Sequence, residues 1–205
     1  MASQQLTPQQ RKNRQLIIGI FAMSIIPFSI AWYLAKNPEL LNSAATNKGQ
    51  LITPAMPTER TDFQGFDTFS QENLKELEAH WLIVNVIPSA DCNDVCLDAL
   101  HKSQQLRLML NKELVRTRRA VLLLDANTSP ETAANWWRED SDLLRLKVNA
   151  AVIEKLNGLY NGKIPDGALL LVDPLGNFMM QYAPQFNPYD VKSDLMHLLK
   201  ISQIG

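Results

Sequence analysis

The chain contains two cysteines, Cys92 and Cys96, and their type and spacing could do chemistry. They lie four positions apart in the segment CNDVC, just after an apolar run at residues 81–88. If a helix begins within this segment, both sulfurs share one face, because residues i and i+4 are one turn apart. Their Cα atoms would then be roughly 6 Å apart, which is within the range for a disulfide. Such a pair could carry redox chemistry or hold a soft metal ion.

Three acidic residues flank the pair, namely Asp91, Asp94 and Asp98. Nearby negative charge disfavours a thiolate, whereas a helix N-terminus stabilises one. If the carboxylates point inward they should dominate, and the couple should then be reducing rather than oxidising. The alternative is that these residues are solvated or cap the helix. A purely structural disulfide is also open, although so short a loop gains little stabilisation from chain entropy.

Composition and motifs exclude several classes of protein. The chain has 205 residues, a formal net charge of −1 and 46% hydrophobic residues, which is ordinary for a globular protein and argues against nucleic-acid binding. Neither a glycine-rich phosphate loop nor an HExxH zinc motif occurs. Three histidines are a small supply for a metalloprotein.

An uncharged apolar stretch at residues 16–35 predicts a transmembrane anchor, because about 20 helical residues span the hydrocarbon core. Arg11, Lys12 and Arg14 precede it, which favours a cytoplasmic N-terminus and a single pass. A cleaved signal peptide or a buried core helix would be alternatives, but the run is full length and ends in bulky residues. The opening residues do not resemble a mitochondrial presequence, so we expect a bacterial inner membrane and a periplasmic C-terminal domain.

The predicted organisation is a cytoplasmic segment at 1–15, the anchor at 16–35, a polar and proline-punctuated linker at 36–61, and one domain at 62–205. Apolar runs predict strands at 81–87, 120–124, 168–172 and 178–182. Helical patterns occur at 70–78, 97–116, from Ser129-Pro130 onward, at 149–160 and at 188–200. This alternation predicts an α/β fold with a mixed sheet, in which the first two strands are parallel and the last hairpin forms an antiparallel edge.

Two side-chain clusters outside the cysteine loop are also notable. Trp136 and Trp137 could mark a binding surface, but we expect one to pack on the core and the other to be partly exposed. Arg116, Arg118 and Arg119 form a basic cluster at the end of the predicted long helix, where we expect them to be solvated.

The order of these parts over about residues 62–200 resembles the thioredoxin fold, with an apolar strand, a cysteine pair opening a helix, and Ile164-Pro165 before a strand-turn-strand. The resemblance implies a mixed β-sheet flanked by helices, here preceded by one transmembrane helix. It also implies that Pro165 is a cis-proline facing the cysteines and shaping a peptide-docking face.

Three local patterns resemble the Sco/SenC proteins, which are membrane-anchored copper and thiol factors for cytochrome c oxidase assembly. The CNDVC segment is similar to their CPDVC loop, and Asp125 with TSPE at 128–131 and VDPLGNF at 172–178 are similar to two later segments. The chain departs from the family at the histidine that serves as its third copper ligand, because residues 163–167 contain none. His80, His101 and His197 lie elsewhere in the sequence, without the spacing of metal ligands.

The resemblance implies a membrane-anchored thiol–disulfide or copper(I)-handling protein, possible oxidoreductase activity, and an oxidase subunit or another assembly factor as its partner. Cys92 would be the attacking thiol, Cys96 the resolving thiol, and both could hold copper(I). The competing interpretation is a non-catalytic interaction module in which the disulfide is structural.

Overall fold

The structure is a computed structural model that describes residues 8–37, 47–137, 140–202 and 204. Part of the predicted cytoplasmic segment, residues 1–7, and part of the predicted linker, residues 38–46, lie outside the described residues. The chain forms two compact units, Met1–Thr46 and Asn47–Gly205, and each is described by itself.

Helix α1 (Pro8–Lys36) is the described part of the first unit. It has 29 residues, and an 18-residue window within it reaches a mean hydropathy of 2.0. Pro27 lies inside this helix, and Lys36 lies in its last turn. By length and composition α1 is a candidate membrane span, and it contains the whole stretch predicted at residues 16–35.

The second unit is built on a seven-stranded sheet in the order β1-β7-β6-β3-β4-β5-β2. Strand β3 pairs in parallel with β4, and β4 with β5, while the other neighbours are antiparallel. The predicted mixed sheet is therefore present. The strands are β1 (Gln50–Pro57), β2 (Phe63–Gly65), β3 (Trp81–Ile87), β4 (Thr117–Leu123), β5 (Leu144–Val148), β6 (Ala168–Val172) and β7 (Asn177–Tyr182).

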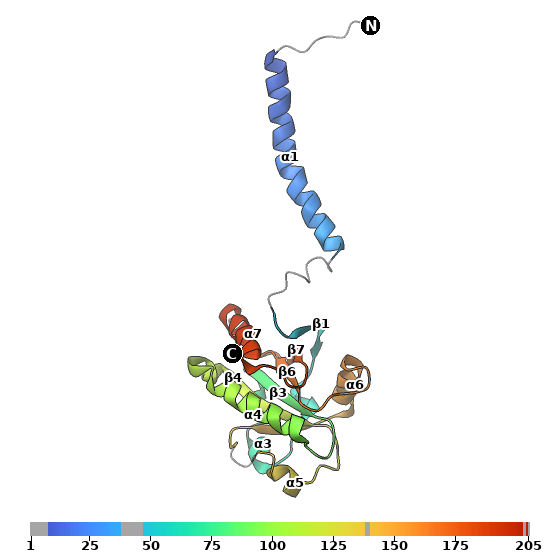
Figure 1. Cartoon of the computed structure of the whole chain (residues 1–205), viewed down its shortest axis with the longest axis vertical. Coiled ribbons are helices and arrows are strands. Elements are labelled where there is room, and N and C mark those ends of the chain that lie inside the picture. The colour runs from blue at the N-terminus through green and yellow to red at the C-terminus, as the bar shows by residue number, and fades with distance from the viewer. Residues whose placement is uncertain (1–7, 38–46, 138–139, 203, 205) are drawn as a thin grey trace. The chain divides into compact units, whose positions relative to one another are not determined.

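Helices cover both faces of the sheet, with α4 and α7 on one side and α6 on the other (Figure 1). Side chains of β3 alternate accordingly, since Ile83 packs towards α4 and α7 whereas Val84 packs towards α6. The helical segments are η1 (Arg60–Asp62), α3 (Thr68–Glu72), η2 (Leu74–Leu77), α4 (Asp94–Leu108), η3 (Asn111–Arg116), α5 (Pro130–Ala134), α6 (Ala150–Leu159) and α7 (Pro188–Ile201).

The longest predicted helix differs from the structure at both ends. Asn93 caps α4, so the helix begins at Asp94 rather than at residue 97. It ends at Leu108, and a 3-10 segment follows because Asn111 has a left-handed backbone with φ of 49°. The helical spacing of apolar residues correctly identified core positions, since Leu106 and Leu110 are both buried.

The predicted linker and the predicted sheet edge also differ from the structure. Strand β1 lies within residues 36–61 and helical turn η1 begins there, and β1 pairs with β7 outside the final hairpin. The hairpin of β6 and β7 is antiparallel as predicted, but β1 and not β7 is the edge. An edge position explains why β1 tolerates Pro54 and Pro57, which had indicated a linker.

The buried Asp194 carboxylate is hydrogen-bonded to the first residues of the domain. The side chain of Asp194 on α7 is 6% exposed and accepts hydrogen bonds from the backbone N–H groups of Lys48 and Gly49, at 2.8 Å each, and from the Tyr182 hydroxyl at 2.9 Å. Burial and the bond to Asp194 raise the pKa of Tyr182. A Cβ atom on Gly49 would lie 2.5 Å from the Tyr182 ring, so this approach requires glycine.

Candidate functional site

Cys92 and Cys96 are joined by a disulfide with a Cα–Cα distance of 5.3 Å. The two sulfurs differ in their surroundings. Cys96 is 2% exposed and belongs to a hydrophobic cluster with Leu100 and Ile87, whereas Cys92 is half-buried and packs against the edge of that cluster. A reagent arriving from solvent therefore reaches Cys92 first.

The start of α4 holds the pair in place. The Asn93 side chain accepts a hydrogen bond from the Cys96 N–H at 3.0 Å, which makes Asn93 the N-cap and places Cys96 in the first helical turn. Unpaired N–H groups and the helix dipole favour negative charge at this end of a helix. A thiolate released from either cysteine would thus form where the backbone stabilises it.

The turn at Pro165 lies against this helix start. Asn93 Nδ2 donates to Asp166 at 2.8 Å, and an ideal Cβ on Gly167 would lie 2.9 Å from the Val95 carbonyl oxygen. The two loops that the sequence singled out are therefore brought together at one end of the sheet. Pro165 itself is partly buried and lines an open depression that also contains Tyr160. Burial raises the pKa of Tyr160 to about 12.

The expectation of a cis peptide bond at Pro165 is wrong. The cis bond among the described residues precedes Pro54, and the bond before Pro165 is trans. The trans form is the one that X–Pro bonds intrinsically prefer. A turn begins at Pro165, in which the Ala168 N–H donates to the Pro165 carbonyl at 3.3 Å. Gly167, with φ of 80°, supplies the reversal that this turn needs at its third position.

We predict that Gly167→Ala will destabilise the domain by about 1–2 kcal/mol, because an L-residue in the left-handed region is strained and its Cβ would press on the first turn of α4. Gly158→Ala is the matched control, since Gly158 lies within α6 with open space around it. That change should stabilise the helix by up to about 1 kcal/mol. Urea unfolding measures both, and equal effects of the two substitutions would contradict the role given to Gly167.

The acidic residues near the disulfide are turned towards solvent. Asp91 and Asp94 are exposed, and Asp98 forms an ion pair with Lys102 at 2.7 Å. Solvent and Lys102 screen their effect on the sulfurs. The interpretation of these residues as solvated loop and helix-start groups fits the structure better than inward-pointing carboxylates. The expected reducing potential stays a prediction.

The three histidines lie on different parts of the fold, His80 before β3, His101 on α4 and His197 on α7. His80 Nδ1 is 2.9 Å from the Glu78 carbonyl oxygen, His101 on α4 is 2.8 Å from the Gln105 amide, and His197 is on the exposed side of α7. Among the described residues, no group of three or more histidine, cysteine or acidic side chains could hold a metal ion. A metal at this site would therefore depend on the two sulfurs.

An aromatic cluster packs beside the disulfide. Trp137 is buried and meets Phe66 edge to face at 6.4 Å, while the half-buried Trp136 stands on Trp137 at 5.5 Å and 88°. The prediction of one packed and one partly exposed tryptophan is confirmed. The Arg145 guanidinium lies 5.4 Å from the Trp137 ring and donates to Asp67 at 2.7 Å. Burial alone would raise the pKa of Asp67, but hydrogen bonds from Arg145 and the Ser70 N–H outweigh it and lower the pKa.

A buried polar network lies between α4 and the sheet. Arg119 on β4 is 2% exposed, so the expectation that it is solvated is wrong. Its guanidinium donates to the Leu100 carbonyl at 3.0 Å and to the Ser103 hydroxyl at 2.9 Å, and it pairs with Asp140. Ser103 also donates to Asn85 of β3 at 2.6 Å. Burial lowers the pKa of Arg119, although Asp140 counteracts this.

The sequence contained a signal for this network that the composition-based interpretation overlooked. Arg119 alternates with Val121 and Leu123 along β4, so its side chain must point to the same face as theirs, under α4. Strand periodicity therefore implies a buried Arg119, provided that β4 begins at Thr117 and not at residue 120 as predicted.

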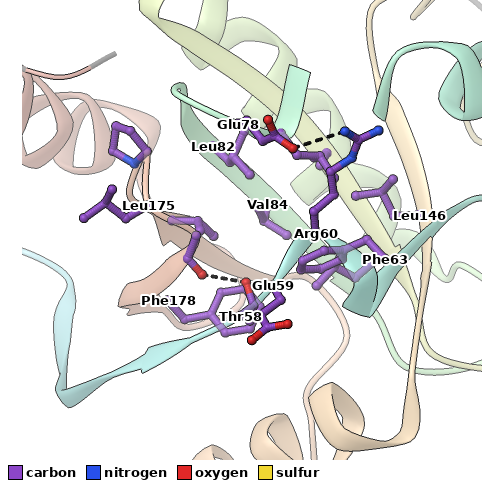
Figure 2. A pocket seen from close by; sticks show the side chains of 16 residues that line it. Thr58, Glu59, Arg60, Phe63, Glu78, Leu82, Val84, Leu146, Leu175 and Phe178 are labelled. Atoms are coloured by element: carbon purple, nitrogen blue, oxygen red, sulfur yellow. Dashed lines mark hydrogen bonds and ion pairs between the residues drawn. The ribbon is translucent and has the colours of Figure 1, made fainter. Parts of the chain in front are cut away.

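A separate apolar cavity of about 80 Å³ lies on the opposite face of the sheet, under the segment that connects β1 to β2. Figure 2 shows Leu82, Val84 and Phe178 along its walls and an ion pair of Arg60 with Glu78, 3.1 Å long, at its rim. No cysteine or histidine is among the described residues that line it. This cavity is therefore separate from the sulfur chemistry.

Comparison with known proteins places the chain in a family. A family model described as "Transmembrane-like, thioredoxin-like, C-terminal domain" matches residues 81–202, which is more than half of the 205 residues. The chain belongs to this family. The matched region contains the disulfide, both tryptophans of the aromatic cluster and the Pro165 turn. No curated protein matches the sequence.

Solved structures support the same fold. The apo Sco1 protein from Thermus thermophilus has 15% sequence identity and a TM-score of 0.53, over 75% of this chain and 97% of that chain. Yeast Sco1 with copper bound has 18% identity and a TM-score of 0.50, over 62% of this chain and 83% of that chain. At such low identity the likeness shows a thioredoxin-like fold, which confirms the predicted fold class.

Proposed function

We propose that this chain is a membrane-anchored, extracytoplasmic thiol–disulfide exchange protein that assists the assembly of cytochrome c oxidase. The observation that carries the exchange function is the asymmetric disulfide, with a reachable Cys92 joined to a buried Cys96 at a helix start. The oxidase connection is supported by the resemblance of the sequence to Sco/SenC proteins. Its client would be an oxidase subunit or another assembly factor.

The topology is part of the same proposal. Residues 16–35 of α1 would cross a bacterial inner membrane, with residues 1–15 cytoplasmic and the domain of residues 47–205 in the periplasm. The hydropathy of α1 and the basic residues Arg11, Lys12 and Arg14 at its start support this orientation. An oxidising compartment would also allow the disulfide to persist.

The reduced pair would act on a client disulfide in two steps. The Cys92 thiolate attacks one client sulfur, which forms a mixed disulfide and releases the other client sulfur as a thiolate. The Cys96 thiolate then attacks the Cys92 sulfur, which releases the second client thiolate and forms the Cys92–Cys96 disulfide seen here. The client gains two electrons, and an external dithiol must supply two electrons to reduce the pair again.

Copper(I) as cargo is the second candidate, and it is supported by the coincidence of two sulfurs at one site and by the fold shared with copper-bound yeast Sco1. Two thiolates can hold copper(I). Among the described residues, no histidine or acidic side chain joins the two sulfurs in a group that could hold a metal ion, so stable copper(II) binding does not fit this donor set. Stoichiometric copper(I) binding to the reduced chain, lost in Cys92→Ser, would support the cargo function.

A redox titration tests the exchange function. The full chain in lipid nanodiscs is equilibrated with defined ratios of reduced to oxidised dithiothreitol or glutathione, and the oxidised fraction is measured by thiol labelling. We expect a midpoint between about −200 and −300 mV, in the range of proteins that exchange disulfides. A midpoint below about −300 mV together with slow exchange would contradict the proposal and favour the structural disulfide of an interaction module.

A further inference from the structure

A groove of about 270 Å³ lies beside α4 and next to the disulfide. One wall comes from α4, and the other comes from Trp136, Trp137, Asp140 and Leu143. The residues that matter here are Leu97, Leu100, His101, Trp136, Trp137 and Leu143. None of them is needed for the exchange of sulfur bonds itself, so the groove calls for a separate explanation.

The groove is continuous with the disulfide site. Leu100 follows Cys96 by four residues, so the two lie on the same face of α4 and about 5.4 Å apart along its axis. Cys96, Leu100 and Trp137 belong to one hydrophobic cluster, and Cys92 and Trp136 both pack against that cluster. Cys92 and the groove therefore border the same hydrophobic cluster, so a client segment bound at Cys92 can extend into the groove.

The leucines and tryptophans of the groove form an apolar part that is already ordered, while His101, Gln104 and Asp140 form its polar part. Trp136 is held edge to face on the buried Trp137, which is itself fixed between Phe66 and the Arg145 guanidinium. On the opposite wall Leu97 is 37% exposed although it sits beside the buried Cys96. A rigid aromatic surface facing an exposed leucine loses little conformational entropy on binding, and tryptophan is enriched at binding hot spots.

We propose that this groove binds a large apolar side chain of the client, placed two or three residues from the client cysteine that reacts with Cys92. The inference rests on the proposed exchange function and names the kind of client that it favours. An extended chain advances about 3.3 Å per residue, so two or three client residues span about 7–10 Å. This length covers the helical turn of about 5.4 Å that separates the disulfide from the groove, with room for the client side chains. The partner is thus a cysteine-containing segment with a nearby phenylalanine, leucine or similar residue.

Peptide mixed disulfides test this proposal. Each peptide carries glutathione on its single cysteine and has phenylalanine two or three residues before or after that cysteine, and a matched peptide has serine there. The reduced full chain in nanodiscs reacts by attack of Cys92 and closure of the Cys92–Cys96 disulfide, which releases the peptide thiol and glutathione. With the native chain we expect at least one phenylalanine peptide to react about tenfold faster than the serine peptide.

Trp136→Ala and Leu97→Ser should each remove that preference while leaving the rate with oxidised glutathione unchanged. Leu175→Ser is the matched control, because Leu175 is also an exposed leucine, 71% accessible, but lies at the rim of the cavity on the other face. It should leave all rates unchanged. Leu97 is exposed, so its substitution tests the groove even if Trp136→Ala loosens the fold.

The outcomes separate the two proposals. Equal rates for all peptides with the native chain, or a phenylalanine preference that survives both groove substitutions, would overturn the docking proposal and leave the exchange function intact. A native chain that does not react with oxidised glutathione would overturn both.

Discussion

The Cys92→Ser variant is expected to react with oxidised glutathione no faster than the background, whereas Cys96→Ser should complete the first step and stop. Cys92 is the half-buried sulfur and Cys96 is 2% exposed, so the remaining thiol of Cys92→Ser cannot be reached by an external disulfide. In Cys96→Ser the reachable thiol is present but its resolving partner is missing. The reaction should therefore accumulate a mixed disulfide between Cys92 and glutathione.

Intact-mass spectrometry of the two variants after incubation with oxidised glutathione distinguishes them. Cys96→Ser should carry one glutathione, and Cys92→Ser should carry none. Urea unfolding controls for stability, and we expect similar values for both because each variant lacks the same short cross-link. The reverse pattern, in which Cys92→Ser is modified and Cys96→Ser is not, would refute the assignment of attacking and resolving thiols.

The second large effect concerns Arg119. Arg119→Ala should destabilise the domain by about 3–5 kcal/mol, which is typical of removing one partner from a buried ion pair. The substitution leaves Asp140, whose side chain is 13% exposed, without its cation, and removes the donors to the Leu100 carbonyl and the Ser103 hydroxyl. Urea unfolding followed by near-UV circular dichroism measures this loss.

Arg60→Ala is the matched control for Arg119→Ala. Arg60 also pairs with a carboxylate, Glu78, but the two side chains are 45% and 60% exposed, and such pairs contribute about 0–1 kcal/mol. The double variant Arg119→Met with Asp140→Leu should recover much of the loss, since apolar replacement of a whole buried pair is tolerated far better than removal of one partner. A loss of stability below about 1 kcal/mol for Arg119→Ala, as for an exposed ion pair, would refute the conclusion that the buried network stabilises the domain.

Strong local patterns made most of the fold predictable. Strands β3 and β6 have the predicted bounds, because a continuous apolar run is unambiguous when both faces of a strand are covered. Helix α5 begins at Pro130 with Ser129 as its cap, as the capping rules predict. The parallel pairing of β3 with β4 followed from the connecting helix.

Two of the three missed strands lacked such patterns. Strand β2 has three residues, which is too short for a clear period in the sequence. Strand β5 does alternate apolar and basic residues, as LRLKV, and this signal was overlooked. Strand β1 contains two prolines, and only its place at the sheet edge makes them acceptable. These three strands depend on partners far away in the sequence, which local propensity does not contain.

The site was predicted in its residues but not in its environment. Spacing alone indicated that Cys92 and Cys96 could be joined, and the disulfide is present. The bond before Pro165 is trans, which is the form that X–Pro bonds intrinsically prefer, although the resemblance implied a cis bond. The ion pair of Arg119 with Asp140 joins residues 21 positions apart, so it arises from a tertiary contact that local patterns do not contain.

The anchoring of α4 bears on what happens when the disulfide opens. The Leu100 carbonyl accepts a hydrogen bond from Arg119, and the Ser103 hydroxyl donates one to Asn85. Two successive turns of α4 just after Cys96 are therefore hydrogen-bonded to the sheet. Conformational relaxation after reduction should consequently be confined to the segment before the helix, around Cys92, while Cys96 keeps its position. The oxidised and reduced proteins would then present nearly identical scaffolds and differ mainly in the freedom of a single sulfur-bearing loop.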